Sequence, residues 1–129
     1  MADDLTGPLV VVVIEDEKAS RDAMGRLLRA GGFEPALYDG AEAFLENRPV
    51  SDPLCLIVDV HLGGMSGLDL QQHLRLTGCL IPIIITTGQR EPHISKRARQ
   101  GGCAALLWKP YPADALLGVI DSLSHERRP

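Results

Sequence analysis

Four apolar segments of the chain end directly in side chains that could do chemistry. The first runs over residues 9–14 and the second over 54–58, and carboxylates follow both: Glu15-Asp16-Glu17 and Asp59. The third and fourth run over 81–86 and 104–108, and they lead to Thr86-Thr87-Gly88 and to Lys109. Carboxylates, hydroxyls and one lysine therefore share the same kind of position, the end of an apolar run.

Carboxylates gathered at one edge of a fold repel one another and raise each other's pKa values. A divalent cation such as Mg²⁺ offsets that repulsion, because it binds oxygen ligands and commonly sits on one or two carboxylates with water and phosphate. Lys109 can pair with Asp59 or with a phosphoryl oxygen, and an aspartate can act as a nucleophile that forms an acyl phosphate. Each residue alone also suits a turn or a helix cap, but the combination predicts a phosphoryl-accepting site.

The elements that position these side chains follow from alternating apolar runs and helix-compatible segments. Apolar runs without strict alternation are typical of parallel strands covered on both faces, and we expect strands over residues 9–14, 33–38, 54–58, 81–86 and 104–108. Five β-then-α units predict a doubly wound α/β sandwich. Pro35 has no N–H for a ladder, which places the second strand at an edge and gives the order 2-1-3-4-5. Ligands of such sheets bind at the carboxyl ends of the strands.

Helix boundaries follow from glycines and capping residues. Gly31-Gly32 should end the first helix, and Asp39 with Glu42 is expected to form a capping pair at the start of the second. The fourth helix, over about residues 92–100, has Ile94 and Ala98 as its apolar anchors and should be the most loosely held.

Length and composition restrict the class of protein. The 129 residues, 45% hydrophobic and 23% charged, suit one globular domain, and we expect it over residues 9–125 with tails at 1–8 and 126–129. The net charge of -4 argues against nucleic acid or anionic membrane as a partner. Three cysteines without a CxxC pair favour neither a disulfide framework nor a zinc site. The acidic start lacks the features of a signal peptide, so a cytoplasmic location is expected.

Four motifs carry a resemblance to a known family: VVIEDE at 12–17, VDVHLGGMSG at 58–67, IIITTG at 83–88 and KPY at 109–111. With them, the chain resembles the receiver (CheY-like) domain of bacterial two-component response regulators over about residues 8–125. It is most similar to the receivers of nitrogen-fixation and nodulation regulators. The resemblance implies a flavodoxin-like (βα)5 fold and a role in phosphorelay signal transduction.

The resemblance also assigns the metal site. Asp59 becomes the phosphate acceptor and one of the ligands of Mg²⁺ or Mn²⁺. The ion would also be bound by Asp16 directly, by Glu15 mainly through water, and by the backbone carbonyl of His61. Glu15 stands where the family more often has aspartate, and Gly63 stands where it usually has proline.

Further residues are assigned to the phosphoryl group and to the output. Lys109 would contact the phosphoryl group, with the backbone amides of Val60 and Gly88, and Lys109-Pro110 would be a cis peptide. Thr87, not Thr86, would supply the switch hydroxyl. His61 and Gln89 would tune the lifetime of the phosphate. The output residues would be Leu106, Trp108 and Tyr111, with Leu106 in place of the usual aromatic residue.

The partners implied are a sensor histidine kinase or a phosphotransfer protein and, through the face around residues 92–125, a downstream protein. The resemblance also allows a phosphorylation-dependent homodimer. It implies a signalling domain that phosphorylates and dephosphorylates itself, not a turnover enzyme. Two alternatives stay open: an interaction module that works without phosphorylation, and an aspartyl-phosphate phosphohydrolase, although Asp59-Val60-His61 lacks the second acid of such enzymes.

Overall fold

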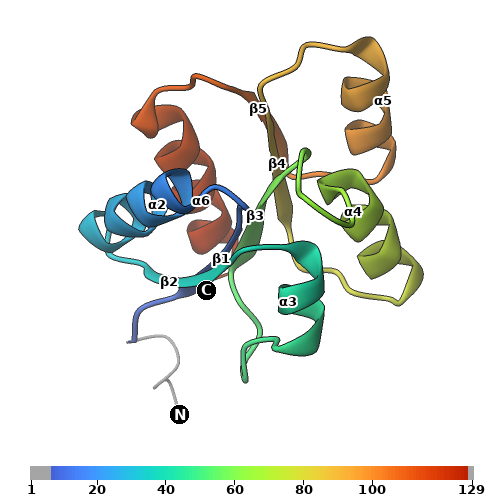
Figure 1. Ribbon diagram of the computed structural model, residues 1–129. Coiled ribbons are helices and arrows are strands. Elements are labelled where there is room, and N and C mark those ends of the chain that lie inside the picture. The colour runs from blue at the N-terminus through green and yellow to red at the C-terminus, as the bar shows by residue number, and fades with distance from the viewer. Residues whose placement is uncertain (1–6, 128–129) are drawn as a thin grey trace.

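The computed structural model describes residues 7–127, which form a parallel sheet between two layers of helices (Figure 1). The strands are β1 (Val10–Ile14), β2 (Glu34–Tyr38), β3 (Cys55–Asp59), β4 (Ile83–Thr87) and β5 (Ala105–Trp108). The helices are α2 (Lys18–Ala30), α3 (Ala41–Glu46), α4 (Gly67–Leu76), α5 (Pro92–Gln100) and α6 (Ala113–Arg127). The sheet order is β2-β1-β3-β4-β5, so the predicted doubly wound α/β class and the order 2-1-3-4-5 are confirmed.

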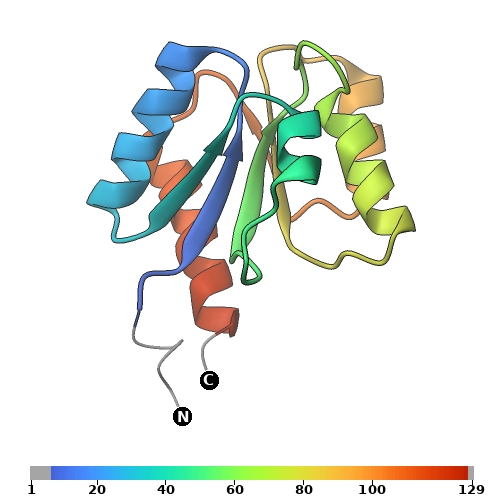
Figure 2. The same ribbon diagram turned by 60° about the horizontal axis from the view of Figure 1, so that its bottom comes forward.

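Different helices cover the two faces of the sheet. Helices α2 and α6 lie on one face, and α3, α4 and α5 lie on the other (Figures 1 and 2). In β1, Val12 and Ile14 pack into the core beneath α3, α4 and α5, whereas Val11 and Val13 pack into the core beneath α2 and α6. Because both faces are covered, an apolar residue is favoured at every position of a central strand.

Strand β2 is an outer strand, as Pro35 predicts. Among the strands of residues 7–127 it pairs with β1 alone, in a parallel register that places Pro35 opposite Val11. The missing N–H of the proline therefore removes no hydrogen bond between the inner strands of the sheet. Strand β5 is the other outer strand and pairs with β4.

Two of the expected helix details are confirmed and one is wrong. Helix α2 ends before Gly31, and the buried residues of α5 are Ile94 and Ala98. The capping pair before α3 does not form: Gly40 precedes the helix, and no side chain caps it. The carboxylate of Glu42 accepts a hydrogen bond from the amide of Met65 at 2.7 Å, because the loop after β3 brings this amide to the start of α3.

The three cysteines are unpaired, as expected. Helix α6 continues to Arg127, two residues past the expected end of the domain. Within residues 7–127, no helix has the length and apolar character that crossing a membrane requires.

Candidate functional site

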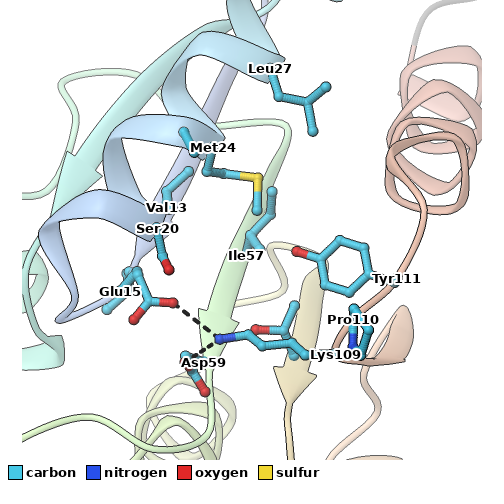
Figure 3. A pocket seen from close by; sticks show the side chains of 13 residues that line it. Val13, Glu15, Ser20, Met24, Leu27, Ile57, Asp59, Lys109, Pro110 and Tyr111 are labelled. Atoms are coloured by element: carbon cyan, nitrogen blue, oxygen red, sulfur yellow. Dashed lines mark hydrogen bonds and ion pairs between the residues drawn. The ribbon is translucent and has the colours of Figure 1, made fainter.

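The carboxyl ends of three strands bring Glu15, Asp59 and Lys109 together. Lys109 Nζ lies 2.6 Å from Asp59 Oδ2 and 3.2 Å from Glu15 Oε1 (Figure 3). Glu15 follows β1, Asp59 ends β3 and Lys109 follows β5, so residues separated by 44 to 94 positions along the chain meet at one edge of the sheet. The parallel order of the strands, with β1 next to β3, is what brings these ends together.

The backbone orients both carboxylates. Asp59 Oδ1 accepts a hydrogen bond from the amide of His61 at 3.1 Å, and Glu15 Oε2 accepts one from the amide of Glu17 at 3.1 Å. Each carboxylate thus has one oxygen on a backbone amide and the other on the Lys109 ammonium. Such charge-assisted bonds hold the two side chains in fixed directions.

Burial and charge shift the pKa values of two of these groups. Burial raises the pKa of Glu15, and the nearby Asp59 charge raises it further, while the Glu17 amide and Lys109 act against this. Burial alone would lower the pKa of Lys109, but its hydrogen bond and charge interaction with Asp59, and then with Glu15, raise it overall. Lys109 therefore stays protonated at neutral pH and partly offsets the two carboxylates.

Asp16 lies outside this cluster. It is exposed, and its Oδ2 would be 3.8 Å from a Cβ placed on Gly63 in the loop after β3. Arg21 donates hydrogen bonds to the backbone carbonyls of Glu15 at 2.9 Å and Asp16 at 3.4 Å, which holds the turn after β1.

The expected metal ligands are oxygen donors, the chemistry that Mg²⁺ prefers, so the residues present fit this ion in kind. In the part of the chain that the structure describes, no three Asp, Glu, His or Cys side chains gather as a ready cluster. Glu15 and Asp59 are the carboxylates already side by side, and the ammonium of Lys109 bridges them.

The two threonines at the end of β4 have different surroundings. Thr86 is 3% exposed and lines the pocket beside Asp59, whereas Thr87 is fully buried. Thr87 Oγ1 accepts a hydrogen bond from the amide of Gln89 at 3.1 Å. Among the hydrogen bonds of residues 7–127, none joins the Thr87 hydroxyl to Asp59, so the expected switch hydroxyl is held by its own loop.

The backbone amides near Asp59 also have distinct partners. The amide of Val60, expected to bind phosphoryl oxygens, donates to the carbonyl of Thr86 at 2.9 Å. The amide of His61 is the one that donates to Asp59, and the His61 side chain is exposed. The Lys109-Pro110 peptide is cis, as expected, and Gly88 is exposed at the end of β4.

A pocket of about 390 Å³ lies beside the cluster, between α2 and the loop before α6 (Figure 3). Met24 and Leu27 form its α2 wall, Tyr111 closes the opposite side, and Asp59 and Lys109 stand at its polar end. Met24 and Leu27 are three residues apart on α2 and therefore share one face of the helix. Their exposure to a pocket depends on how α2 lies over the sheet, which spacing does not show.

The expected output residues lie on and next to β5. Leu106 packs against the core beneath α3, α4 and α5, and Trp108 is half-buried at the end of the strand. The guanidinium carbon of Arg90 lies 5.1 Å from the centre of the Trp108 ring. Spacing along the sequence does not show this contact, because Arg90 precedes α5 in the chain and Trp108 follows it.

Comparison with known proteins agrees with this arrangement. The profile of the response regulator receiver domain matches residues 11–121. The chain is 32% identical over 119 residues to the transcriptional regulatory protein FixJ of Bradyrhizobium diazoefficiens, covering 92% of this chain and 58% of FixJ. It is 33% identical over 119 residues to nodulation protein W of the same organism, covering 92% of this chain and 52% of that protein.

Solved structures give the same result. The FixJ-N crystal structure superposes with a TM-score of 0.83 at 26% identity, covering 93% of this chain and 96% of that one. Full-length FixJ from B. japonicum gives a TM-score of 0.85 at 32% identity, covering 96% of this chain and 61% of that one. The chain thus spans between half and two thirds of the length of these full-length relatives. By sequence, fold and the placement of its acidic site, the chain belongs to the response regulator receiver domain family of two-component systems.

Proposed function

We propose that Asp59 accepts a phosphoryl group from the phosphohistidine of a sensor histidine kinase or a phosphotransfer protein. The observation that carries this proposal is the contact of Lys109 Nζ with Asp59 Oδ2 at 2.6 Å and with Glu15 Oε1 at 3.2 Å. Asp59 is 8% exposed, so a donor can reach its carboxylate while the surroundings stay largely free of water. A carboxylate in such a place is a suitable nucleophile.

The transfer needs no proton from the protein. A carboxylate oxygen of Asp59 attacks phosphorus and the P–N bond of phosphohistidine breaks. The released nitrogen keeps the electron pair, and the proton on the other ring nitrogen makes the leaving group a neutral imidazole. Lys109 then bonds a phosphoryl oxygen, which stabilises charge on the transferring group. Hydrolysis reverses the state: water attacks phosphorus, phosphate leaves, and the Asp59 carboxylate is restored.

We infer that Mg²⁺ or Mn²⁺ would be held by the carboxylates of Glu15, Asp16 and Asp59 and by the backbone carbonyl of His61. When bound, the ion would supply positive charge that neutralises the phosphoryl oxygens. The support is the oxygen-only donor set and the raised pKa of Glu15, which burial and Asp59 cause and which a cation would counter.

The remaining residues of the site act on the phosphoryl group after transfer. The hydroxyl of Thr87 and the amides of Val60 and Gly88 would donate to its oxygens, while His61 and Gln89 would set how long it survives. The first two donors must leave their present acceptors to do so, since Thr87 is bound to Gln89 and the Val60 amide to Thr86. Phosphorylation is therefore expected to rearrange the end of β4.

The output would pass through the face formed by α5, β5 and α6, with Leu106, Trp108 and Tyr111 as its apolar residues, to a downstream protein or to a second copy of the chain. The domain itself would not contact nucleic acid or membrane, and it would not turn over a substrate. We place its activity in the cytoplasm, where three unpaired cysteines are compatible with a reducing environment. A receiver-like module that works without phosphorylation is the second candidate, because Leu106 stands where the family has an aromatic switch.

The test is incubation with acetyl phosphate and Mg²⁺, followed by intact-mass measurement. The wild type should gain about 80 Da, one phosphoryl group, and Asp59→Asn should gain nothing. Asp39→Asn is the matched control, since Asp39 is an exposed carboxylate that follows β2 at the same edge of the sheet. An unmodified wild type would contradict the proposal and favour the phosphorylation-independent module. An adduct that survives in Asp59→Asn would also contradict it, because the phosphoryl group would then be on another residue.

A further inference from the structure

Trp108 lies next to the phosphoryl-accepting site, because two of its neighbours, Thr87 and Lys109, belong to that site. It is the one tryptophan in the chain and the last residue of β5. The parallel register places it opposite Thr87 of β4, and Lys109 follows it directly. The amide of Lys109 donates to the carbonyl of Thr87 at 2.8 Å. Trp108 is therefore paired with Thr87 and adjacent to Lys109, the two residues that the proposed function assigns to the phosphoryl group.

Arg90 covers the Trp108 ring. Its guanidinium carbon is 5.1 Å from the ring centre, although the Arg90 side chain is exposed and Trp108 is half-buried. A cation–π contact at an exposed site is weak compared with one that is shielded from water. The position of Arg90 over the ring therefore depends on the backbone that carries it, the loop between β4 and α5.

The Thr87 hydroxyl fixes the first part of that loop. Thr87 Oγ1 accepts from the Gln89 amide at 3.1 Å, and Arg90 is the next residue. A side-chain oxygen that binds the amide two residues on is a local turn that competes with other uses of the hydroxyl. The same oxygen therefore holds the Arg90 loop and is the group expected to turn toward a phosphoryl group.

We propose that phosphorylation of Asp59 uncovers Trp108, because the Thr87 hydroxyl leaves the Gln89 amide and the loop takes Arg90 off the ring. The inference rests on the proposed function. A phosphoryl group carries close to two negative charges, and a hydrogen bond to a charged acceptor is stronger than one between neutral groups. The hydroxyl, which donates to the Gln89 carbonyl at 3.4 Å, accordingly exchanges this neutral bond for a charge-assisted one. As Oγ1 turns, it no longer accepts from the Gln89 amide, and the released loop no longer sets the place of Arg90.

This arrangement supplies an aromatic output at a different position from the one the family uses. Leu106 has no ring or hydroxyl to change its contacts, and it packs against the core beneath α3, α4 and α5. Trp108, two residues later, has an aromatic ring and is half-buried, and the Arg90 guanidinium that lies over the ring can move away. Its exposure would report the state of Asp59 without any movement of Leu106.

The test measures quenching of Trp108 fluorescence by acrylamide, a neutral quencher that loss of a charge does not repel or attract. In the wild type, acetyl phosphate with Mg²⁺ should raise the quenching constant roughly two-fold as the cation leaves the ring. Arg90→Gln should show the raised value before phosphorylation and change little after it. Thr87→Val, which removes the oxygen that binds Gln89, should also start from the raised value. Arg99→Gln removes an exposed guanidinium of α5 and should behave as the wild type, because among residues 7–127 the cation over the Trp108 ring is Arg90.

Intact mass, recorded on the same samples, separates the two hypotheses. If the adduct forms on Asp59 and the quenching constant stays constant, the inference is overturned and the proposed function stands. If no adduct forms, both are overturned. Wild-type quenching in unphosphorylated Arg90→Gln, with an unchanged circular dichroism spectrum, would show that Arg90 does not shield the ring and would also overturn the inference.

Discussion

The centre of the sheet and its β5 edge are built in different ways. Every residue of β3 and β4 is buried, and so is all of β1 except its first residue, whereas all four residues of β5 are only half-buried. Glu15, Asp59 and Thr87 stand at the ends of the three central strands, and Trp108 and Lys109 stand at the end of the edge strand. Glu15 and Asp59, which must keep a fixed geometry, are thus at the ends of buried strands. The groups expected to move are Thr87, at the end of the strand that pairs with β5, and Trp108 on β5 itself.

Helix α5, next to this edge, is held largely by polar contacts. Its buried side chains are Ile94 and Ala98. Gln71 Nε2 of α4 donates to the carbonyl of Ala98 at 2.9 Å, and Arg97 of α5 donates to Asp69 at 2.7 Å. Hydrogen bonds and exposed ion pairs contribute less net stability than burial of large apolar side chains. The centre should therefore resist unfolding more strongly than the α5–β5 edge.

The largest expected change in the free energy of unfolding comes from truncating two side chains that lie opposite one another, one in the centre of the sheet and one on its edge. Ile85 of β4 and Leu106 of β5 lie opposite one another, and Ile85 is fully buried while Leu106 is half-buried. Ile85→Ala should lower the free energy of unfolding by about 2–5 kcal/mol, the usual cost of such a cavity. Leu106→Ala should cost clearly less, because its site can admit water. Urea denaturation of both variants measures the difference, and equal losses would break the comparison between centre and edge.

Removing the buried amide between α4 and α5 should have a smaller effect. Gln71 is 2% exposed and donates one of the two hydrogen bonds to the carbonyl of Ala98, the other coming from the Cys103 amide at 3.2 Å. Gln71→Leu would remove the first of these bonds, at a cost of about 0.5–1.5 kcal/mol. Hydrogen exchange should then show faster opening of α5 than of the central strands. His73→Leu is the matched control, because His73 is an exposed residue of α4 whose side chain makes no hydrogen bond to α5 among those of residues 7–127. If Gln71→Leu destabilised β4 and α5 to the same extent, α5 would be part of the rigid centre.

The centre of the fold could be predicted from the sequence, because each central strand is an apolar run and each run ends in a polar residue. Those features fixed the strand order, the edge position of Pro35 and the meeting of Glu15 with Asp59. Burial on both faces explains why this worked: a segment such as 81–86 has few other ways to hide six apolar or small side chains.

Contacts made by loops could not be predicted. Glu42 binds the amide of Met65, 23 residues away, instead of capping α3, and the Asp16 carboxylate lies beside Gly63 in the loop after β3. Arg90 meets Trp108 only because the loop after β4 turns back over the edge strand. Such partners depend on loop conformation, which no hydrophobic period encodes, and they are concentrated where the proposed function needs movement.

The smallest expected change in stability tests whether Lys109, at the end of the edge strand, sets the charge state of Glu15 at the end of a central strand. Burial, with the Asp59 charge, raises the pKa of Glu15 in the folded protein, so its ionised form costs stability. This cost is absent below the unfolded pKa of about 4.5 and appears as the pH rises through the higher folded pKa. Glu15→Gln should therefore be more stable than the wild type at pH 8, by on the order of 1 kcal/mol, and the gap should shrink toward pH 5.

Urea denaturation of both proteins at several pH values measures this gap, with Glu34→Gln, on the exposed side of β2, as the control. In a Lys109→Met background the gap should widen, because Lys109 lowers the pKa of Glu15 through its charge and its hydrogen bond. The edge lysine would then be shown to set the charge state of a central carboxylate. A gap that ignores pH, or one that Lys109→Met leaves unchanged, would mean that centre and edge are electrostatically independent, and that movement of β5 could not alter the acidic site.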